Sequence, residues 1–333
     1  MSFDILMLVV SLGLILLASL VFTNGVELLG ARLGLHQGAT GSILAAVGTA
    51  LPETIIPIIA IVVYRHDPQA VQVGIGAIAG APFMLATLAF FVTGASVLIY
   101  AALGRRTTQM HADPRVIGRD LSFFLLLYGA AVLATFAHEC FPLRALVAGV
   151  LLCSYVVYVR RSIQAAGAHH EKLDALHLAR LFRTGNHGWL IALQVAAALG
   201  LMIGGSHLFV RFVSGLSSEL GMSPLILSMI ITPIATEMPE KMNSVIWTAQ
   251  RKDTLALGNI TGALVFQCSV PVVFGLLFTP WDLRGAPMVS AALALSGAGL
   301  TLVWLRRRRA LSPYLLLACG LLYAVFVFYV CRR

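Results

Sequence analysis

Long apolar stretches separated by short polar segments recur along almost the whole chain of 333 residues. The hydrocarbon core of a bilayer is about 30 Å thick and is crossed by about 20 helical residues. The pattern therefore predicts an all-α polytopic membrane protein. Ten transmembrane helices are expected, near residues 3–23, 40–64, 70–101, 120–138, 143–160, 188–212, 224–248, 254–278, 287–305 and 312–331. The third stretch is long enough to be tilted or broken.

Composition agrees with a membrane protein. Hydrophobic residues make up 59% of the chain and charged residues only 11%, whereas soluble domains carry about a quarter charged residues. The net charge of +9 comes from short segments between the apolar stretches, without a basic face interleaved with aromatic residues. We therefore expect no nucleic-acid partner. No nucleotide-binding loop is present, so ATP-driven pumping is not expected, and the sequence does not define an oligomeric state.

The basic residues orient the predicted helices, because loops on the cytoplasmic side of a membrane are enriched in lysine and arginine. With the N-terminus outside, sixteen basic residues fall in inside segments and five in outside segments. This predicts an integral protein of the plasma (bacterial inner) membrane with both termini outside. The inside residues are Arg32, Arg105, Arg106, Arg115, Arg119, Arg160, Arg161, Lys172, Arg180, Arg183, Arg251, Lys252, Arg306, Arg307, Arg308 and Arg309.

An internal repeat links the two halves of the chain. The stretch LGLHQGATGSILAAVGTALPE (33–53) aligns without gaps on LGMSPLILSMIITPIATEMPE (220–240), and GIGAIAG (74–80) then aligns on ALGNITG (256–262). Each copy has Thr-x-x-Pro-Glu followed by a Gly-x-x-x-Gly pair. The copies lie on the second and seventh predicted helices, five positions apart, and because five is odd they cross the membrane in opposite directions. Such inverted repeats occur in many secondary transporters, with midplane sites on interrupted helices.

This repeat defines the predicted organisation of the chain. A first five-helix repeat covers residues 1–160, a cytoplasmic linker covers 161–187, and a second five-helix repeat covers 188–333. The periodicity of the linker predicts a short amphipathic helix at the membrane interface, without a separate domain.

Each Pro-Glu copy gathers oxygen atoms within about one helical turn. The proline removes an N–H and frees a carbonyl one turn earlier, and in lipid such a carbonyl must face protein or a water-filled cavity. The freed carbonyl, a threonine hydroxyl and the glutamate carboxylate together form a set of hard oxygen ligands suited to calcium or sodium. The candidate ligands are Thr49 and Glu53 in the first copy, and Thr236 and Glu240 in the second.

A structural role is the alternative for these motifs. The prolines would then only kink two helices, and each glutamate would pair with a basic side chain such as Lys241 beside Glu240. A charged residue at mid-membrane costs at least a few kcal/mol and is functional by default, so two related copies favour a site. The glycine pairs predict close helix packing, which would bring the third and eighth helices against the Pro-Glu helices.

These motifs resemble those of the sodium/calcium exchangers in the cation/calcium exchanger superfamily. Their two inverted alpha-repeats typically read G-T-S-x-P-E on one helix and G-N-x-x-G-S-N on the next. This chain has GTALPE and GAIAGAP in the first repeat, and ATEMPE and GNITGAL in the second. The resemblance covers the ten-helix layout, the loop after the fifth helix and both repeats. It implies that the protein is not an enzyme and needs no cofactor, but exchanges calcium against sodium or protons as substrates.

The chain departs from the family pattern in its second motif. The polar residue that closes G-S-N is Pro82 in the first repeat and Leu264 in the second, so two cation ligands of the family are absent. The asparagine after the first glycine is present as Asn259, a further candidate ligand, but is Ala77 in the first repeat. We therefore expect at least one sodium site to be lost.

The second Pro-Glu motif carries extra charge. Glu237 stands where the family has serine, three residues from Glu240 on the same helical face, and Lys241 follows. Two neighbouring carboxylates seldom both ionise, so Glu237 is the candidate proton carrier, unless Lys241 neutralises one of them permanently.

Three functions remain open at this point. The first is a secondary cation antiporter that works by alternating access, with Glu53 and Glu240 as the ligands of the transported cation. The second is a proton-coupled transporter of another cation on the same scaffold. The third is a transport-inactive scaffold. An intramembrane enzyme is disfavoured, because no nucleophile or metal-binding cluster lies at a matching depth in the sequence.

Overall fold

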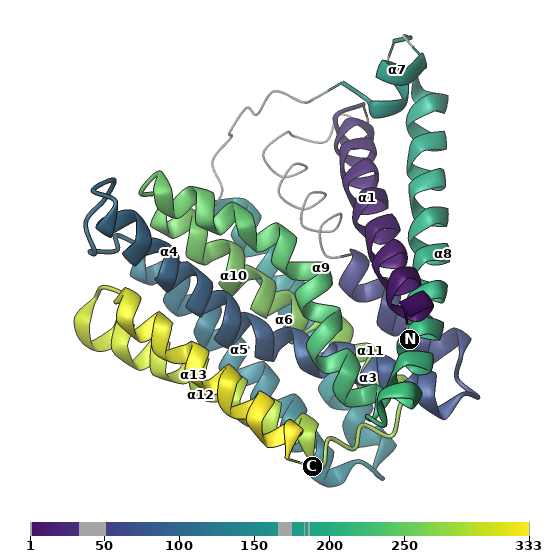
Figure 1. Cartoon of the computed structure of the whole chain (residues 1–333). Coiled ribbons are helices and arrows are strands. Elements are labelled where there is room, and N and C mark those ends of the chain that lie inside the picture. Colours follow the sequence, from purple (N-terminus) through teal and green to yellow (C-terminus); the bar gives the residue numbers. More distant parts are fainter. Residues whose placement is uncertain (1, 33–50, 166–174, 183, 186, 333) are drawn as a thin grey trace.

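The computed structural model describes residues 2–32, 51–165, 175–182, 184–185 and 187–332, and within these ranges the ordered elements are all helical (Figure 1). A helix at Leu51–Val63 ends in the π-helical turn Ile59–Val63. The turn Leu85–Ala89, called η2, is also π-helical, and Ala134–Ala137 is a 3₁₀ turn. The α-helices are α1 (Ser2–Arg32), α3 (Pro68–Met84), α4 (Phe90–Ala102), α5 (Pro114–Leu133), α6 (Phe141–Ala165), α7 (His177–Phe182), α8 (Gly188–Leu220), α9 (Pro224–Ala249), α10 (Asp253–Gln267), α11 (Val270–Phe278), α12 (Ala286–Arg308) and α13 (Pro313–Cys331).

Eight helical segments of the described chain are long and apolar enough to cross a membrane. They are Phe3–Leu29, Pro68–Ala102, Pro114–Ala137, Phe141–Ser162, Gly188–Leu220, Asp253–Phe278, Ala286–Arg308 and Pro313–Cys331. Two shorter apolar helices, Leu51–Val63 and Pro224–Met238, fall at the positions predicted for the second and seventh spans. The second of these is the apolar part of α9, where charged residues begin at Glu237. The Pro-Glu motifs lie on these two helices, with Glu53 close to the first described residue of the Leu51–Val63 helix and Glu240 within α9.

Local sequence explains where several helices begin and end. Proline is at the start of α3 and α5, where its missing N–H costs nothing, and the side chains of Asp67 and Asp113 accept hydrogen bonds from the first-turn amides. Helix α8 ends at Gly221, whose φ of +66° is the left-handed conformation that glycine adopts most easily.

The third predicted span is interrupted, as its length suggested. Pro82 lies inside α3, and η2 separates α3 from α4. The second repeat has a matching interruption at Ser269, between α10 and α11. Ser269 lies seven residues after Gly262, just as Thr87 lies seven after Gly80. Both hydroxyls donate to the carbonyl four residues earlier, so the two breaks have the same local chemistry.

Helix contacts occur in reciprocal pairs. Helices α1 and α8 pack along each other, as Figure 1 shows. Helix α4 contacts α13 while α6 contacts α11, and α3 contacts α12 while α5 contacts α10. We match the helices of the two halves in chain order, so that α3 and α4 correspond to α10 and α11, α5 to α12, and α6 to α13. In each of the two pairs of contacts just named, one contact then corresponds to the other. The main apolar core lies among α3, α4, α5, α10, α12 and α13.

The linker contains a short helix that docks on the protein. In α7 and just before it, Leu176 and Ala179 are buried against Leu190 and Ile191 of α8. The amide of Gln194 on α8 accepts a hydrogen bond from the backbone N–H of Leu178 at 2.9 Å. The sequence predicted a helix here at the membrane interface, and the structure packs its apolar side against α1 and α8.

Candidate cation site

Helix α3 lies directly on the backbone of α9. A Cβ atom at Gly76 would collide with the carbonyl oxygen of Leu225, and one at Gly80 would collide with that of Met229. The hydroxyl of Ser228 also donates to the carbonyl oxygen of Val73 at 2.7 Å. The predicted packing role is therefore confirmed for the first glycine pair.

For the second glycine pair, a Cβ atom at Gly258 or Gly262 would have no neighbour within 4 Å among the residues that the structure describes. In the repeat, positions 38 and 42 align with Leu225 and Met229, and they lie outside the described residues. The close approach of another helix to this pair stays a prediction.

Four ionisable side chains lie in the region where the Leu51–Val63 helix approaches α9. Glu53 is 7% exposed, Glu237 is fully buried, Lys241 is 3% exposed and Glu240 is half-buried. Glu53 interacts electrostatically with Glu240, Glu237 and Lys241. The candidate ligands Glu53 and Glu240 thus interact across the two halves of the chain, and a cation shared by them stays a prediction.

Glu237 has a partner that the sequence analysis missed. The side-chain amide nitrogen of Gln267, at the end of α10, donates to Oε1 of Glu237 at 2.7 Å, and both side chains are buried. Gln267 lies eight residues after Asn259, so both project from the same face of α10. A polar residue at that spacing in an apolar helix was the signal that could have revealed it.

Two carboxylate oxygens in this region have no partner in the described structure. Oε2 of Glu53 and Oε2 of Glu237 are both buried and accept no hydrogen bond. Buried polar atoms are nearly always bonded, and exceptions mark functional groups or an absent water or ion. A proton or a cation would satisfy these oxygens.

Asn259 connects α10 to α9. Its amide nitrogen lies 3.3 Å from the backbone oxygen of Glu240 and 3.1 Å from Oγ of Ser244. The hydroxyl of Ser244 in turn donates to the carbonyl of Ala256 at 2.8 Å. In this structure the Asn259 side chain therefore clamps two helices together beside the acidic residues.

Lys241 does not neutralise its acidic neighbours by direct contact. Its ammonium nitrogen lies 3.4 Å from the backbone oxygen of Asn259. Among the described residues, no ion pair joins Lys241 to Glu237 or Glu240, although its charge acts on both carboxylates. Lys241 is thus a nearby positive charge rather than a bonded counter-ion.

The Pro-Glu motif does not interrupt α9, contrary to the expectation from its proline. The helix continues from Pro224 to Ala249 through Pro239. A proline removes one backbone hydrogen bond, and serine or threonine side chains help a membrane helix to tolerate the loss. The buried Thr236 hydroxyl donates to the carbonyl of Thr232 at 2.9 Å, whereas the carbonyl that Pro239 leaves free is that of Ala235.

The remaining predicted ligand, Thr49, lies outside the described residues. Within those residues, no three histidine, cysteine, aspartate or glutamate side chains are close enough to form a metal-binding group. The arrangement is therefore a set of buried acids with unsatisfied oxygens, lined by amide and hydroxyl groups.

Comparison with known proteins identifies the family. The sequence profile described as sodium/calcium exchanger protein matches residues 3–164 and 190–332. CaxA of Alkalimonas amylolytica, named as an antiporter, is 30% identical over 147 residues, which are 42% of this chain and 46% of that relative. The inner membrane protein YrbG of Escherichia coli strain K12 is 25% identical over 281 residues, covering 83% of this chain and 80% of YrbG.

Solved structures share the fold at low sequence identity. The H⁺/Ca²⁺ exchanger CAX has a TM-score of 0.69 at 13% identity, with 98% of this chain and 86% of CAX covered. The sodium–calcium exchanger NCX_Mj has a TM-score of 0.58 at 18% identity, with 98% of each chain covered. Proteins of this kind move ions across membranes and are not enzymes. This chain is an integral membrane protein that belongs to the sodium/calcium exchanger family.

Proposed function

We propose that the protein is a secondary active antiporter that exchanges calcium or a related cation against sodium or protons by alternating access. The observation that supports this most is the pair of buried glutamates, Glu53 and Glu237, each with one unbonded carboxylate oxygen. Uncompensated carboxylates are costly inside a membrane, so these oxygens need a proton or cation. A transported ion can supply that charge in one state and leave it in another.

The ligands of the transported cation would come from both halves of the chain. Glu53 and Thr49 contribute from the first half, and Thr236, Glu237, Glu240 and Asn259 from the second. Carboxylate, hydroxyl and amide oxygens are the ligands that Ca²⁺ and Na⁺ prefer. The electrostatic coupling of Glu53 to Glu240 supports a shared site.

The proposed architecture is ten transmembrane helices in two inverted repeats, 1–160 and 188–333, joined by the linker 161–187. The reciprocal helix contacts and the matching interruptions at Thr87 and Ser269 support this division. The distribution of basic residues supports a topology with both termini outside. The resemblance to YrbG supports the inner membrane as the location.

Proton coupling is a second candidate, favoured by Glu237. This side chain is fully buried, has one unbonded oxygen and lies near Glu240. The polar residues that close the family motif are replaced by Pro82 and Leu264, which removes ligands that a sodium ion would use. A proton needs only one carboxylate oxygen.

Transport by the purified protein in proteoliposomes tests the proposal. Calcium, manganese, sodium and proton gradients are imposed one at a time on the wild type and on Glu53→Gln and Glu240→Gln. Each substitution preserves shape and removes the charge that a divalent cation requires, so each should abolish exchange. Glu139→Gln is the matched control, because Glu139 is exposed. Full activity in either site variant would contradict the shared site.

A further inference from the structure

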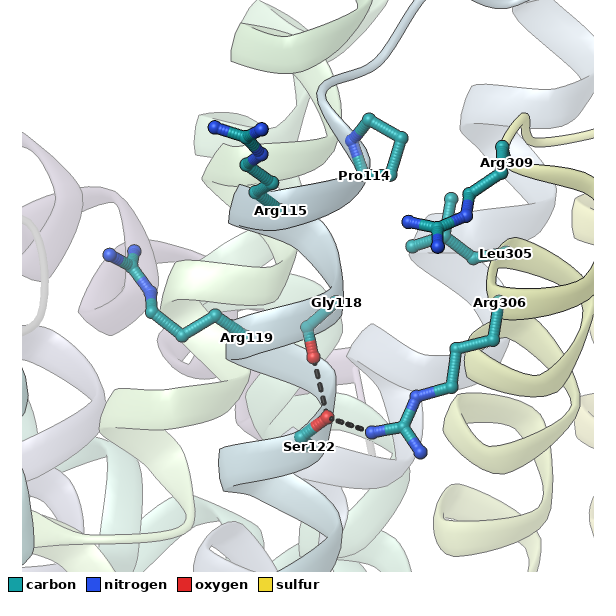
Figure 2. A pocket seen from close by; sticks show the side chains of 8 residues that line it. All are labelled: Pro114, Arg115, Gly118, Arg119, Ser122, Leu305, Arg306 and Arg309. Carbon is teal, nitrogen blue, oxygen red and sulfur yellow. Dashed lines mark hydrogen bonds between the residues drawn. The ribbon is translucent and has the colours of Figure 1, made fainter.

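A basic pocket lies between the beginning of α5 and the end of α12 (Figure 2). Its volume is about 610 Å³. Helix α5 contributes Arg115 and Arg119, and α12 together with the residue after it contributes Arg306 and Arg309. None of the residues that line it is acidic. The pocket is therefore suited to an anion.

Most of this positive charge is not used within the protein. Arg119 pairs with Asp120 at 3.0 Å. Within the described part of the chain, Arg115, Arg306 and Arg309 form no ion pair. Arg306 donates a single side-chain hydrogen bond, to the hydroxyl of Ser122 at 3.0 Å. The guanidinium groups of Arg306 and Arg309 thus remain available to a ligand between the helices, while Arg115 extends from the other side of α5 (Figure 2).

The arrangement of the arginines goes beyond what membrane topology requires. Topology explains an excess of basic residues at one membrane face, but not their direction. In Figure 2, Arg306 and Arg309 extend from α12 toward α5, across a gap bordered by Gly118. A Cβ atom at Gly118 would have nothing closer than 3.8 Å, the distance to Cδ2 of Leu305. The absence of a side chain at Gly118 keeps this space open.

The pocket opens at the level of the lipid headgroups. Both helices that form it are candidate membrane spans, α5 at its first residues and α12 at its last. The large apolar side chains of Leu126 and Leu133 are exposed on α5, further along the helix face that carries the pocket residues Gly118, Arg119 and Ser122. Arg308 lies over the ring of Trp304, 5.8 Å from its centre, and tryptophan and arginine are typical anchors at this depth. An acyl chain could lie along the exposed apolar side chains of α5 while its headgroup enters the pocket.

We propose that this pocket binds the phosphate of an anionic phospholipid headgroup. Guanidinium groups form paired, charge-assisted hydrogen bonds with phosphate oxygens, and basic pockets between membrane helices are suited to such headgroups. Free phosphate shares this chemistry but would gain nothing from the exposed apolar side chains of α5. The site is separate from the acidic residues of α9, so the proposal does not depend on which ion is transported.

Native mass spectrometry of the full chain in mild detergent tests the proposal, with phosphatidylglycerol titrated against phosphatidylcholine. The wild type should bind phosphatidylglycerol preferentially. The double variant Arg306→Gln/Arg309→Gln should bind it about tenfold more weakly or worse, because two charge-assisted contacts are lost. The matched control is Arg307→Gln/Arg308→Gln, which removes the same charge from residues that do not line the pocket, and its affinity should change less than threefold.

A second variant keeps every arginine. Gly118→Glu would put a carboxylate into the pocket and should also abolish the preference for phosphatidylglycerol. Equal losses in the two double variants would mean general surface attraction and would refute the pocket. Wild-type binding by Gly118→Glu would refute it as well. Displacement of the lipid by inorganic phosphate at equal concentration would overturn the assignment to a lipid headgroup.

Discussion

The connection between α4 and α5 is held to α10 by a buried ion pair, and removing one partner should destabilise the protein strongly. The guanidinium of Arg106 contacts both carboxylate oxygens of Asp253, at 2.7 and 3.0 Å, and the two side chains are 2% and 0% exposed. Arg106 also donates to the carbonyl of Thr248 at 2.7 Å, and the backbone N–H of His111 donates to Asp253 at 2.8 Å. The Arg106 guanidinium and the backbone N–H of His111 thus both donate to the buried carboxylate of Asp253.

The substitution Asp253→Asn preserves the shape of the side chain but leaves the Arg106 charge buried without a counter-ion. Breaking a buried pair in this way costs about 3–5 kcal/mol. For a chain of this length, each kcal/mol of lost stability lowers the melting temperature by about 2 °C. Asp253→Asn should therefore lower the melting temperature by roughly 6–10 °C. Thermal unfolding of the purified protein in detergent, followed by tryptophan fluorescence, measures this.

An exposed ion pair in the same protein provides the control. Asp282 and Arg284 pair at 2.5 Å, but their side chains are 31% and 75% exposed. The Arg284 side chain hydrogen-bonds the Asp282 carboxyl and holds its pKa below its usual value, so this pair stabilises at neutral pH and is lost as the pH falls through that lowered pKa. Exposed pairs contribute little, and Asp282→Asn should hardly change the melting temperature. Equal shifts for Asp253→Asn and Asp282→Asn would refute the argument from burial.

Three further predictions concern the site, the helix packing and the topology. Glu237→Ala should weaken the response of transport to a pH gradient, measured in proteoliposomes, and sodium-driven transport at constant pH that is unchanged in this variant would contradict proton carriage by Glu237. Gly80→Leu should destabilise the protein by about 1–3 kcal/mol or more, because the backbone of Met229 cannot move aside, whereas Gly129→Leu meets no atom within 4 Å and should be tolerated in the same unfolding assay. A reporter fused after Arg333 should read as non-cytoplasmic, and a cytoplasmic signal would overturn the proposed orientation.

Hydropathy and the repeated motif predicted most of the helical framework. They could not predict the partners of the charged side chains, because those depend on how helices face one another. Lys241 stands beside Glu240 in the sequence, yet its ammonium reaches the backbone of Asn259 on α10. Successive side chains of a helix point in different directions, so neighbours in the sequence are seldom partners in the fold. Gln267 was missed for the same reason.

The continuity of α9 was also not predictable from the motif. A proline removes one hydrogen bond, but whether the helix then breaks depends on what supports it. Here α3 packs on the first half of α9 through Gly76 and Gly80, and the Asn259 clamp holds its second half. These tertiary contacts lie on both sides of the proline and were not visible in the motif.

The two matched interruptions give the molecule a pair of mechanical joints. On one side of η2, α3 is fixed to α9, and on the other side α4 packs along α13. Likewise α10 is clamped to α9, while α11 beyond Ser269 packs on α6. We therefore expect that, when the peripheral helices α6 and α13 adapt to the thickness of the surrounding bilayer, the chain bends at these joints before the acidic residues are displaced.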